Sequence, residues 1–173
     1  MTNFKEGLRL VKAFVFDVDG VLSSPLILVH PGGELMRTMN TKDGYALQHA
    51  VKRGYPIGII TGGRTESVAI RFRGLGITDI YLGSSNKRDD LKDFTSRYGL
   101  QLEDVLYMGD DLPDYEVMQL VGIPCCPSDA VAEIKTISHY ISPFPGGHGC
   151  ARDVIEQVLR LHGRWMDGES FEW

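Results

Sequence analysis

The chain has 173 residues, of which 43% are hydrophobic and 24% charged, as expected for a globular protein large enough to build one core without disulfide or metal staples. Its net charge of -5 gives no reason to expect nucleic acid or an anionic membrane as a partner. The N-terminus lacks the apolar region of a signal peptide, and no apolar run could span a bilayer, so we expect a cytoplasmic protein. The three cysteines are odd in number and two are adjacent, which excludes a regular disulfide framework.

The first expected strand is an apolar run at residues 13–16, and two acids and a glycine (Asp17, Asp19 and Gly20) follow it closely. Two short strand-like pieces, 26–29 and 35–39, then flank a loop with two glycines and predict a β-hairpin. A lone hairpin is marginal in water. We therefore expect the apolar residues of this hairpin to pack on a neighbour, for example another subunit.

Strands and helices alternate through the rest of the chain. A polar loop at 40–44 leads to a helix at 45–53, and the tail from residue 163 is expected to be mobile or docked on a partner. The further strands are expected at 57–60, 79–82, 105–108, 123–126 and 139–141, and the further helices at 65–73, 87–98, 114–120, 129–135 and 151–162. This alternation predicts right-handed βαβ units. The expected fold is a single doubly wound, Rossmann-like α/β domain with a parallel sheet and a small hairpin insertion.

Reactive side chains follow three of the expected strands. Asp17 and Asp19 follow the first strand, Thr61 the second and Asp110 the strand at 105–108, while Lys87 begins a helix. The carboxyl ends of parallel strands meet at one edge of a sheet, so these groups should converge on one crevice. Crowded carboxylates repel one another, and Mg²⁺ relieves that repulsion because it prefers oxygen ligands. The pattern predicts a magnesium site for phosphoryl transfer.

These residues together resemble the haloacid dehalogenase-like phosphatases. Residues 17–20 match the first motif of that family, Thr61 the second and Lys87 the third, while the fourth motif corresponds to residues 109–114. The resemblance implies that Asp17 is the nucleophile that forms an aspartyl-phosphate, and that Asp19 is first the general acid and then the general base. Thr61 and Lys87 would hold the transferring phosphoryl group.

The same resemblance implies a ligand set for the metal. Asp17, the main-chain carbonyl of Asp19 and Asp110 would bind Mg²⁺, and Asp111 and Asp114 would be supporting or alternative ligands. Most members of the family insert a cap domain after the first or second motif. Here only the hairpin at 26–39 follows the first motif, and residues 61–87 leave no room for a domain. The chain therefore resembles the capless branch.

Residues 40–45, 85–87, 109–111 and 146–149 are similar to the 3-deoxy-D-manno-octulosonate 8-phosphate phosphatase family. That resemblance implies hydrolysis of an eight-carbon sugar-acid phosphate for lipopolysaccharide biosynthesis. It also implies a homotetramer in which the hairpins assemble the subunits and neighbouring subunits complete each substrate pocket. The candidate substrate-binding residues are Asn40, Thr41, Lys42, Asp43, Gly44, Arg64, Arg71 and His148.

Two departures from the family pattern leave the substrate open. The family often has Thr-Gly-Arg after the second strand, but here Gly63 intervenes and Arg64 comes one place later; the family also often has arginine in place of His148. A nine-carbon, sialic-acid-type ulosonate 9-phosphate is therefore an alternative substrate. A non-catalytic oligomerisation module of the same fold is a further alternative, although such modules tend to lose the residues that correspond to Asp19 or Lys87. A phosphomutase is disfavoured, because without a cap water should reach the intermediate.

Overall fold

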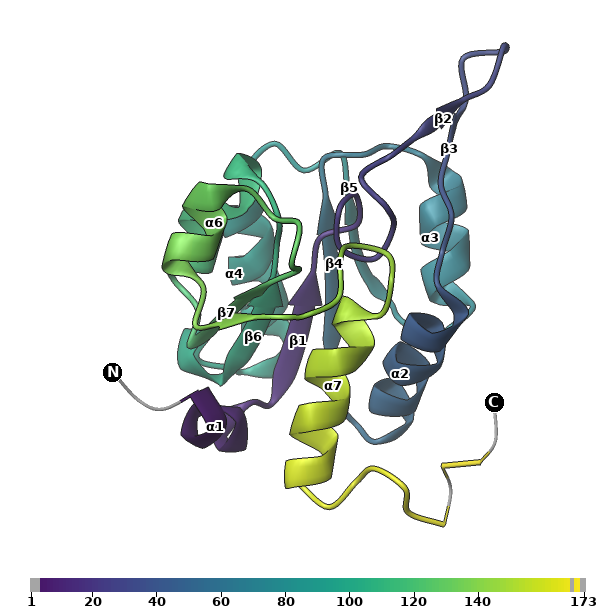
Figure 1. Cartoon of the computed structure of the whole chain (residues 1–173). Helices are drawn as coiled ribbons and strands as arrows, with labels where there is room; N and C mark the ends of the chain where they lie inside the picture. Colours follow the sequence, from purple (N-terminus) through teal and green to yellow (C-terminus); the bar gives the residue numbers. More distant parts are fainter. Residues whose placement is uncertain (1–3, 169, 172–173) are drawn as a thin grey trace.

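A six-stranded parallel sheet forms the centre of the computed structural model, which describes residues 4–168, 170 and 171 (Figure 1). Its strand order is β5-β4-β1-β6-β7-β8, and every neighbouring pair is parallel. The strands are β1 (Ala13–Phe16), β4 (Ile57–Thr61), β5 (Asp79–Leu82), β6 (Val105–Met108), β7 (Ile123–Cys126) and β8 (Tyr140–Ile141). This confirms the doubly wound sheet predicted from the sequence.

Helices cover both faces of the sheet, because the side chains of each strand point alternately to opposite sides. The helices are α2 (Thr41–Lys52), α3 (Glu66–Arg73), α4 (Lys87–Tyr98), α5 (Tyr115–Met118), α6 (Ala132–Ile137) and α7 (Cys150–Leu161). In β1, Phe14 and Phe16 pack in the cluster with α2, α3 and α7, whereas Ala13 and Val15 pack in the cluster with α4, α5 and α6. All four residues are fully buried.

The direction of chain travel reverses beside β1. The chain goes from β1 to β4 and β5 on one side, and then crosses to β6, β7 and β8 on the other. Open α/β sheets bind ligands beyond the carboxyl ends of the strands at such a switch point. The backbone N–H of Asp17, one residue past β1, still donates to the Met108 carbonyl of β6, so β1 and β6 reach this edge together.

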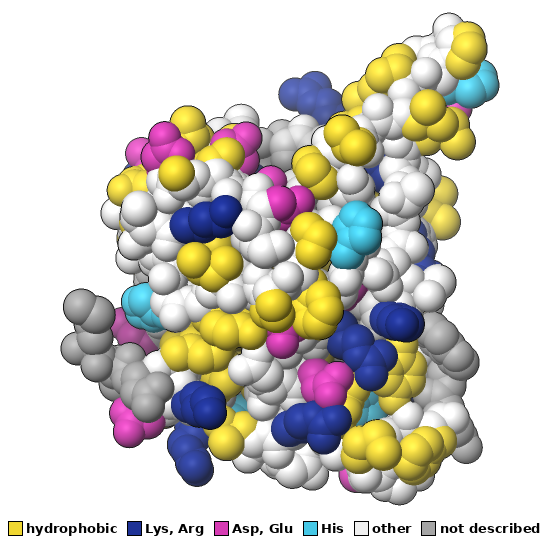
Figure 2. All heavy atoms as spheres, in the orientation of Figure 1, with side chains coloured by type: hydrophobic (Ala, Val, Ile, Leu, Met, Phe, Trp, Pro, Cys, Tyr) yellow, Lys and Arg dark blue, Asp and Glu magenta, His cyan; other side chains and the backbone are white. Residues whose placement is uncertain are grey.

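The hairpin consists of β2 (Leu28–Val29) and β3 (Leu35–Met36) and projects away from the sheet (Figure 1). Its apolar side chains face solvent in the single chain: Leu26 is 83% exposed and Leu28 66%. Figure 2 shows hydrophobic side chains gathered on this projecting arm. Between β1 and β4, where every residue is described, the chain adds to the hairpin only turns and α2, which confirms that no cap domain is inserted there.

Two local predictions need correction, and one element was not predicted. The polar loop predicted at 40–44 is largely the first turn of α2, because the Asn40 side chain caps the helix by accepting from the backbone N–H groups of Lys42 and Asp43. A short N-terminal helix, α1 (Phe4–Gly7), and the 3₁₀ turn η1 (Leu8–Leu10) that follows it were not predicted from the sequence. The helix predicted at 114–120 is only one turn, α5, preceded by a 3₁₀ turn, η3 (Leu112–Asp114).

The described part of the tail packs on its own chain. The indole ring of Trp165 meets the ring of His49 edge-on, with 5.3 Å between centroids, and the Arg152 guanidinium lies 5.2 Å from the centre of the Trp165 ring. The His49 Nε2 atom lies 3.0 Å from the carbonyl oxygen of Arg164. These contacts hold the tail against α2 and α7. None of the described helices is long and apolar enough to cross a membrane.

Candidate active site

The turn after β1 brings the first two acids to the edge of the sheet. Gly20 makes this turn possible, because its φ of 82° lies in the left-handed region that side chains with a Cβ rarely adopt. A Cβ at residue 20 would also lie only 1.9 Å from the Oδ2 atom of Asp110. The turn after β1 therefore packs directly against the carboxylate that follows β6.

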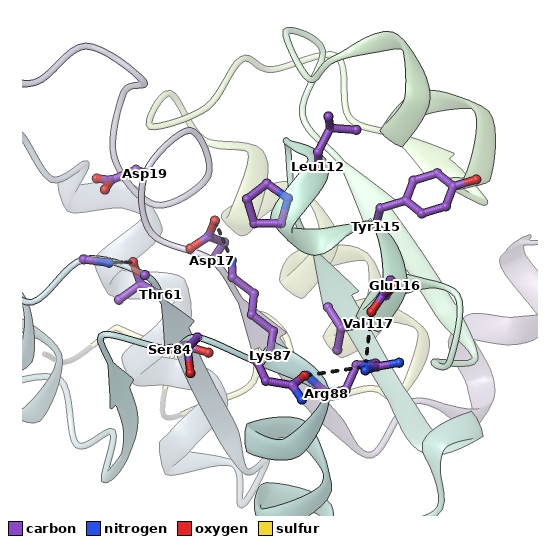
Figure 3. A pocket seen from close by; sticks show the side chains of 15 residues that line it. Asp17, Asp19, Thr61, Ser84, Lys87, Arg88, Leu112, Tyr115, Glu116 and Val117 are labelled. Atoms are coloured by element: carbon purple, nitrogen blue, oxygen red, sulfur yellow. Dashed lines mark hydrogen bonds and ion pairs between the residues drawn. The ribbon is translucent and has the colours of Figure 1, made fainter.

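Lys87, the first residue of α4, reaches into the same place (Figure 3). Asn86 caps this helix by accepting from the backbone N–H of Arg88. The Lys87 ammonium lies 2.9 Å from Asp17 Oδ2 and donates to Asp114 Oδ1 at 2.7 Å. Only 7% of Lys87 is exposed, so the lysine is a buried positive charge shared by two carboxylates.

The two later aspartates of the fourth motif have different places. Asp114 is fully buried, and its carboxylate accepts from Lys87, from the Tyr107 hydroxyl at 2.7 Å and from the backbone N–H of Asp110 at 3.2 Å. It therefore braces the site rather than offering a free oxygen to a ligand. Asp111 is exposed and caps η3, accepting from the backbone N–H of Leu112.

The carboxylates of Asp17, Asp110 and Asp114 form a group that could hold a metal, with one oxygen of each lying within 4.8 Å of the others. An all-oxygen donor set of this kind suits Mg²⁺. Because Asp114 is already engaged in three hydrogen bonds, Asp17 and Asp110 are the side chains of this group that fit best as ligands.

The electrostatics of the site suit the binding of a divalent cation. Burial, reinforced by the Asp114 carboxylate and opposed by Lys87, raises the pKa of Asp17 to about 8. Burial and the charges of Asp114 and Asp111 raise the pKa of Asp110 to about 7. Burial alone would lower the pKa of Lys87, but Asp17 and Asp114 more than offset this effect and raise it. Crowded, desolvated carboxylates of this kind are stabilised in their ionised form by a bound divalent cation.

A cavity of about 710 Å³ opens beside these groups. Asp17, Asp19, Thr61 and Lys87 all line it, so the four predicted catalytic residues come together (Figure 3). Thr61 ends β4, and its hydroxyl accepts from the backbone N–H of Gly63 at 3.1 Å. The other lining residues are Gly62, Gly63, Ser84, Ser85, Asn86, Arg88, Leu112, Pro113, Tyr115, Glu116 and Val117.

Two residues that support this site were not predicted from the sequence. Arg37, just after β3, makes an ion pair with the Asp19 carboxylate. Tyr107, in β6, donates to the buried Asp114. A charged residue in a hairpin and a tyrosine in a buried strand have ordinary structural explanations, so neither position carries a motif. Only the folded chain shows these contacts.

The candidate substrate-binding residues do not gather in this cavity. Asn40, Thr41, Lys42 and His148 line a separate cavity of about 690 Å³ beside α7. Arg64 lines a groove under the hairpin, and this groove shares Gly62 and Gly63 with the catalytic cavity.

Asp43, Gly44 and Arg71 lie between helices. Asp43 is buried, and its oxygens accept from the backbone N–H groups of Gly149 and Arg152 at the start of α7. The Arg71 guanidinium lies against Gly44, where a Cβ would come within 2.4 Å of its Nη2 atom. In the single chain Asp43 therefore links α2 to the start of α7, and Arg71 of α3 packs closely on Gly44 of α2.

The fold and the site fit a phosphoryl-transfer enzyme, and comparison with known proteins specifies the class. Residues 64–152 match the family described as haloacid dehalogenase-like hydrolase, and the chain belongs to that family. It is 36% identical over 159 residues to the 3-deoxy-D-manno-octulosonate 8-phosphate phosphatase of Escherichia coli K12, which covers 92% of this chain and 83% of that protein.

Two solved structures show the same architecture. The 3-deoxy-D-manno-octulosonate 8-phosphate phosphatase of Yersinia pestis superposes with a TM-score of 0.91 and 31% identity, covering 94% of this chain and 88% of its own. The enzyme of the same name from Moraxella catarrhalis, solved with magnesium, phosphate and KDO, gives a TM-score of 0.88 and 31% identity, covering 93% of this chain and 92% of its own. The family predicted from the four motifs is confirmed.

Proposed function

We propose that this protein hydrolyses the phosphate monoester of 3-deoxy-D-manno-octulosonate 8-phosphate and depends on Mg²⁺. The observation that carries the proposal is the convergence of Asp17, Asp19, Thr61 and Lys87 on one cavity, with Asp110 packed against the turn of Gly20. The relatives that bear the name of this activity cover most of the chain and share its fold. The complex of the Moraxella catarrhalis enzyme contains magnesium, phosphate and KDO, which fits the donor set found here.

In the first chemical step the phosphoryl group moves from the sugar to Asp17, and each group in the cavity has a role. An oxygen of Asp17 attacks the phosphorus, the bond from phosphorus to the sugar oxygen breaks, and Asp19 donates a proton to the departing alkoxide. Lys87, which contacts Asp17 at 2.9 Å, also carries a positive charge for the phosphoryl oxygens. The Thr61 hydroxyl would donate a hydrogen bond to the same phosphoryl oxygens.

The second step releases phosphate and restores the enzyme. Asp19 takes a proton from a water molecule, the water oxygen attacks the phosphorus of the aspartyl-phosphate, and the bond to Asp17 breaks. Mg²⁺, held by Asp17, the main-chain carbonyl of Asp19 and Asp110, would neutralise the charge of the phosphoryl oxygens when bound. Asp114 keeps Lys87 and the backbone of Asp110 in place through both steps.

The proposal includes a homotetramer with shared active sites. Exposed apolar side chains on the hairpin, Leu28 and Val29 among them, support an interface there. The cavity lined by Lys42 and His148 lies apart from the catalytic cavity of the same chain, so these residues would complete the pocket of a neighbouring subunit. We expect Leu28→Asp to reduce the molar mass measured by light scattering; an unchanged mass would remove the hairpin from the interface.

The proposed location is the cytoplasm. The cysteines Cys125, Cys126 and Cys150 are all buried and free, which is typical of a protein that folds in a reducing compartment. The product of the reaction would supply lipopolysaccharide biosynthesis.

The decisive experiment measures phosphate release from 3-deoxy-D-manno-octulosonate 8-phosphate with Mg²⁺ present and after chelation. Activity should require Mg²⁺, and Asp17→Asn should abolish it. Asp89→Asn, a matched change at an exposed aspartate in the first turn of α4, should leave it intact. Normal hydrolysis by Asp17→Asn would refute the nucleophile, and absence of hydrolysis by the wild type would favour a non-catalytic module. The ratio of kcat/KM for the eight-carbon substrate and a nine-carbon ulosonate 9-phosphate decides between the two sugars.

A further inference from the structure

Arg37 links the hairpin to the proton-transferring carboxylate of the site. It is the residue directly after β3, and its Nε and Nη2 atoms donate to Asp19 Oδ1 and Oδ2 at 2.5 and 2.9 Å. Its Nη1 atom donates to the Leu35 carbonyl and to the Thr65 hydroxyl, each at 3.1 Å. Only 5% of the Arg37 side chain is exposed. The guanidinium is therefore fixed from the hairpin on one side and from the turn before α3 on the other.

The position of the Arg37 guanidinium gives a structural reason for Gly63, the glycine that departs from the family pattern. A Cβ at Gly63 would lie 3.2 Å from Arg37 Nη2, 3.4 Å from Thr61 Oγ1 and 3.7 Å from Asp19 Oδ2. A longer side chain at residue 63 would have to start in this corner and would compete with the guanidinium. Gly63 leaves the corner to Arg37.

We propose that Arg37 is a positioning residue that holds the Asp19 carboxylate in the orientation for proton transfer, with Gly63 providing the space it needs. This inference rests on the proposed function, in which Asp19 protonates the leaving alkoxide. Without Arg37, Asp19 would keep one side-chain partner among the described residues, the Ser23 hydroxyl at 3.2 Å. A bidentate arginine fixes both carboxylate oxygens at once, which a single hydroxyl contact does not do.

The pairing of Arg37 with both oxygens of Asp19 still allows one of these oxygens to carry the proton that the mechanism requires. When one carboxyl oxygen is protonated it becomes a donor, while the carbonyl oxygen still accepts. The guanidinium then loses one contact to Asp19 and keeps the other, so the carboxyl stays anchored. The proton moves to the sugar oxygen as the bond from that oxygen to phosphorus breaks, and both arginine contacts form again.

The test compares two leaving groups. A sugar alkoxide needs a proton when it departs from phosphorus, whereas p-nitrophenolate is stable as an anion and needs none. The value of kcat/KM reports the steps up to formation of the aspartyl-phosphate, so hydrolysis of that shared intermediate does not affect the comparison. A residue that acts through Asp19 must therefore affect the sugar phosphate selectively, and a general structural defect would affect both substrates.

For Arg37→Ala we expect kcat/KM for 3-deoxy-D-manno-octulosonate 8-phosphate to fall by about 10- to 100-fold, because small misplacements of a catalytic group have effects of this size. The value for p-nitrophenyl phosphate should change little, and Asp19→Asn should show the same selectivity. Arg37→Lys should also lose most of the rate, because lysine keeps the charge but lacks the fork. The matched control is Arg73→Ala, which removes an exposed arginine paired with Glu66 and should leave both substrates unaffected.

Equal losses with both substrates, or no loss with either, would overturn the positioning role, and normal activity of Arg37→Lys would overturn the need for a fork. The competition for space is tested by adding Gly63→Arg to the wild type and to Arg37→Ala. We expect a larger loss in the wild-type background; equal effects in both would refute the shared corner. Failure of the wild type to hydrolyse the sugar phosphate would instead refute the proposed function, so the two ideas fail separately.

Discussion

Asp114→Asn tests the brace under the active site. The substitution keeps the shape of a side chain that is fully buried and accepts from Lys87, Tyr107 and the backbone N–H of Asp110. The amide oxygen of asparagine can still accept from Lys87 and Tyr107. The amide nitrogen then faces the backbone N–H of Asp110, which leaves two donors without an acceptor.

The size of the effect follows from these contacts. A buried donor without a partner destabilises the folded state by about 1–3 kcal/mol, so two such donors destabilise it by about 2–6 kcal/mol. In a chain of this length each kcal/mol lowers Tm by about 2–4 °C, so we expect a fall of about 4–24 °C in thermal denaturation. The kcat should fall as well, because Lys87 loses one of its two carboxylate partners. Since Asp114 raises the pKa values of Asp17 and Asp110, its loss should also allow Mg²⁺ to bind at lower pH.

The matched control lies three residues away in the same motif. Asp111 is exposed and caps a 3₁₀ turn, and asparagine caps as well as aspartate. Asp111→Asn should therefore change the free energy of unfolding by less than about 0.5 kcal/mol. Calorimetry and urea denaturation of both variants provide the measurement. Equal stability of the two variants, or greater damage from Asp111→Asn, would refute the assignment of Asp114 as the brace.

Three further predictions concern the acidic site and the start of α7. Folding raises the pKa of Asp17 from 3.8 to about 8 and that of Asp110 from 3.8 to about 7, so between these values the folded state binds more protons than the unfolded state. The metal-free protein should therefore become less stable as the pH rises from about 4 to about 8. Mg²⁺ should accordingly raise Tm more at pH 8 than at pH 6, and an equal rise would contradict the raised pKa values. Gly20→Ala should abolish Mg²⁺ binding measured by calorimetry, since its Cβ would displace the Asp110 carboxylate. Asp43→Ala should lower the free energy of unfolding in urea by about 1–3 kcal/mol, because the backbone N–H groups of Gly149 and Arg152 lose their acceptor. Unchanged stability would show that these two hydrogen bonds are dispensable.

The sequence predicts the sheet well because each central strand is a short apolar run with a polar group at its carboxyl end. The bounds of β1, β5, β6 and β7 agree with the expected ranges. Helix α2 begins at Thr41 rather than at the expected residue 45. Gly44 disfavours a helix by local propensity, but the Asn40 cap and the packing of the helix on α7 favour one and outweigh it.

The site could be predicted only as far as its motifs extend. Asp17, Thr61 and Lys87 follow from their places at strand and helix ends, since parallel topology brings those ends together. The difference between Asp111 and Asp114 depends on η3, which turns one carboxylate outward and buries the other. The contact of Arg37 with Asp19 spans 18 positions and depends on how the hairpin leaves the sheet. No periodicity in the sequence encodes such a contact.

The position of β1 has a consequence for local unfolding. This strand lies between β4 and β6 with all four residues fully buried, so it belongs to the part of the chain that opens last. In the single chain the hairpin that carries Arg37 has two short strands and exposed side chains, so without a neighbouring subunit it belongs to the part that opens first. Thermal fluctuation of the hairpin would therefore weaken the contact of Arg37 with Asp19 while Asp17 keeps its place.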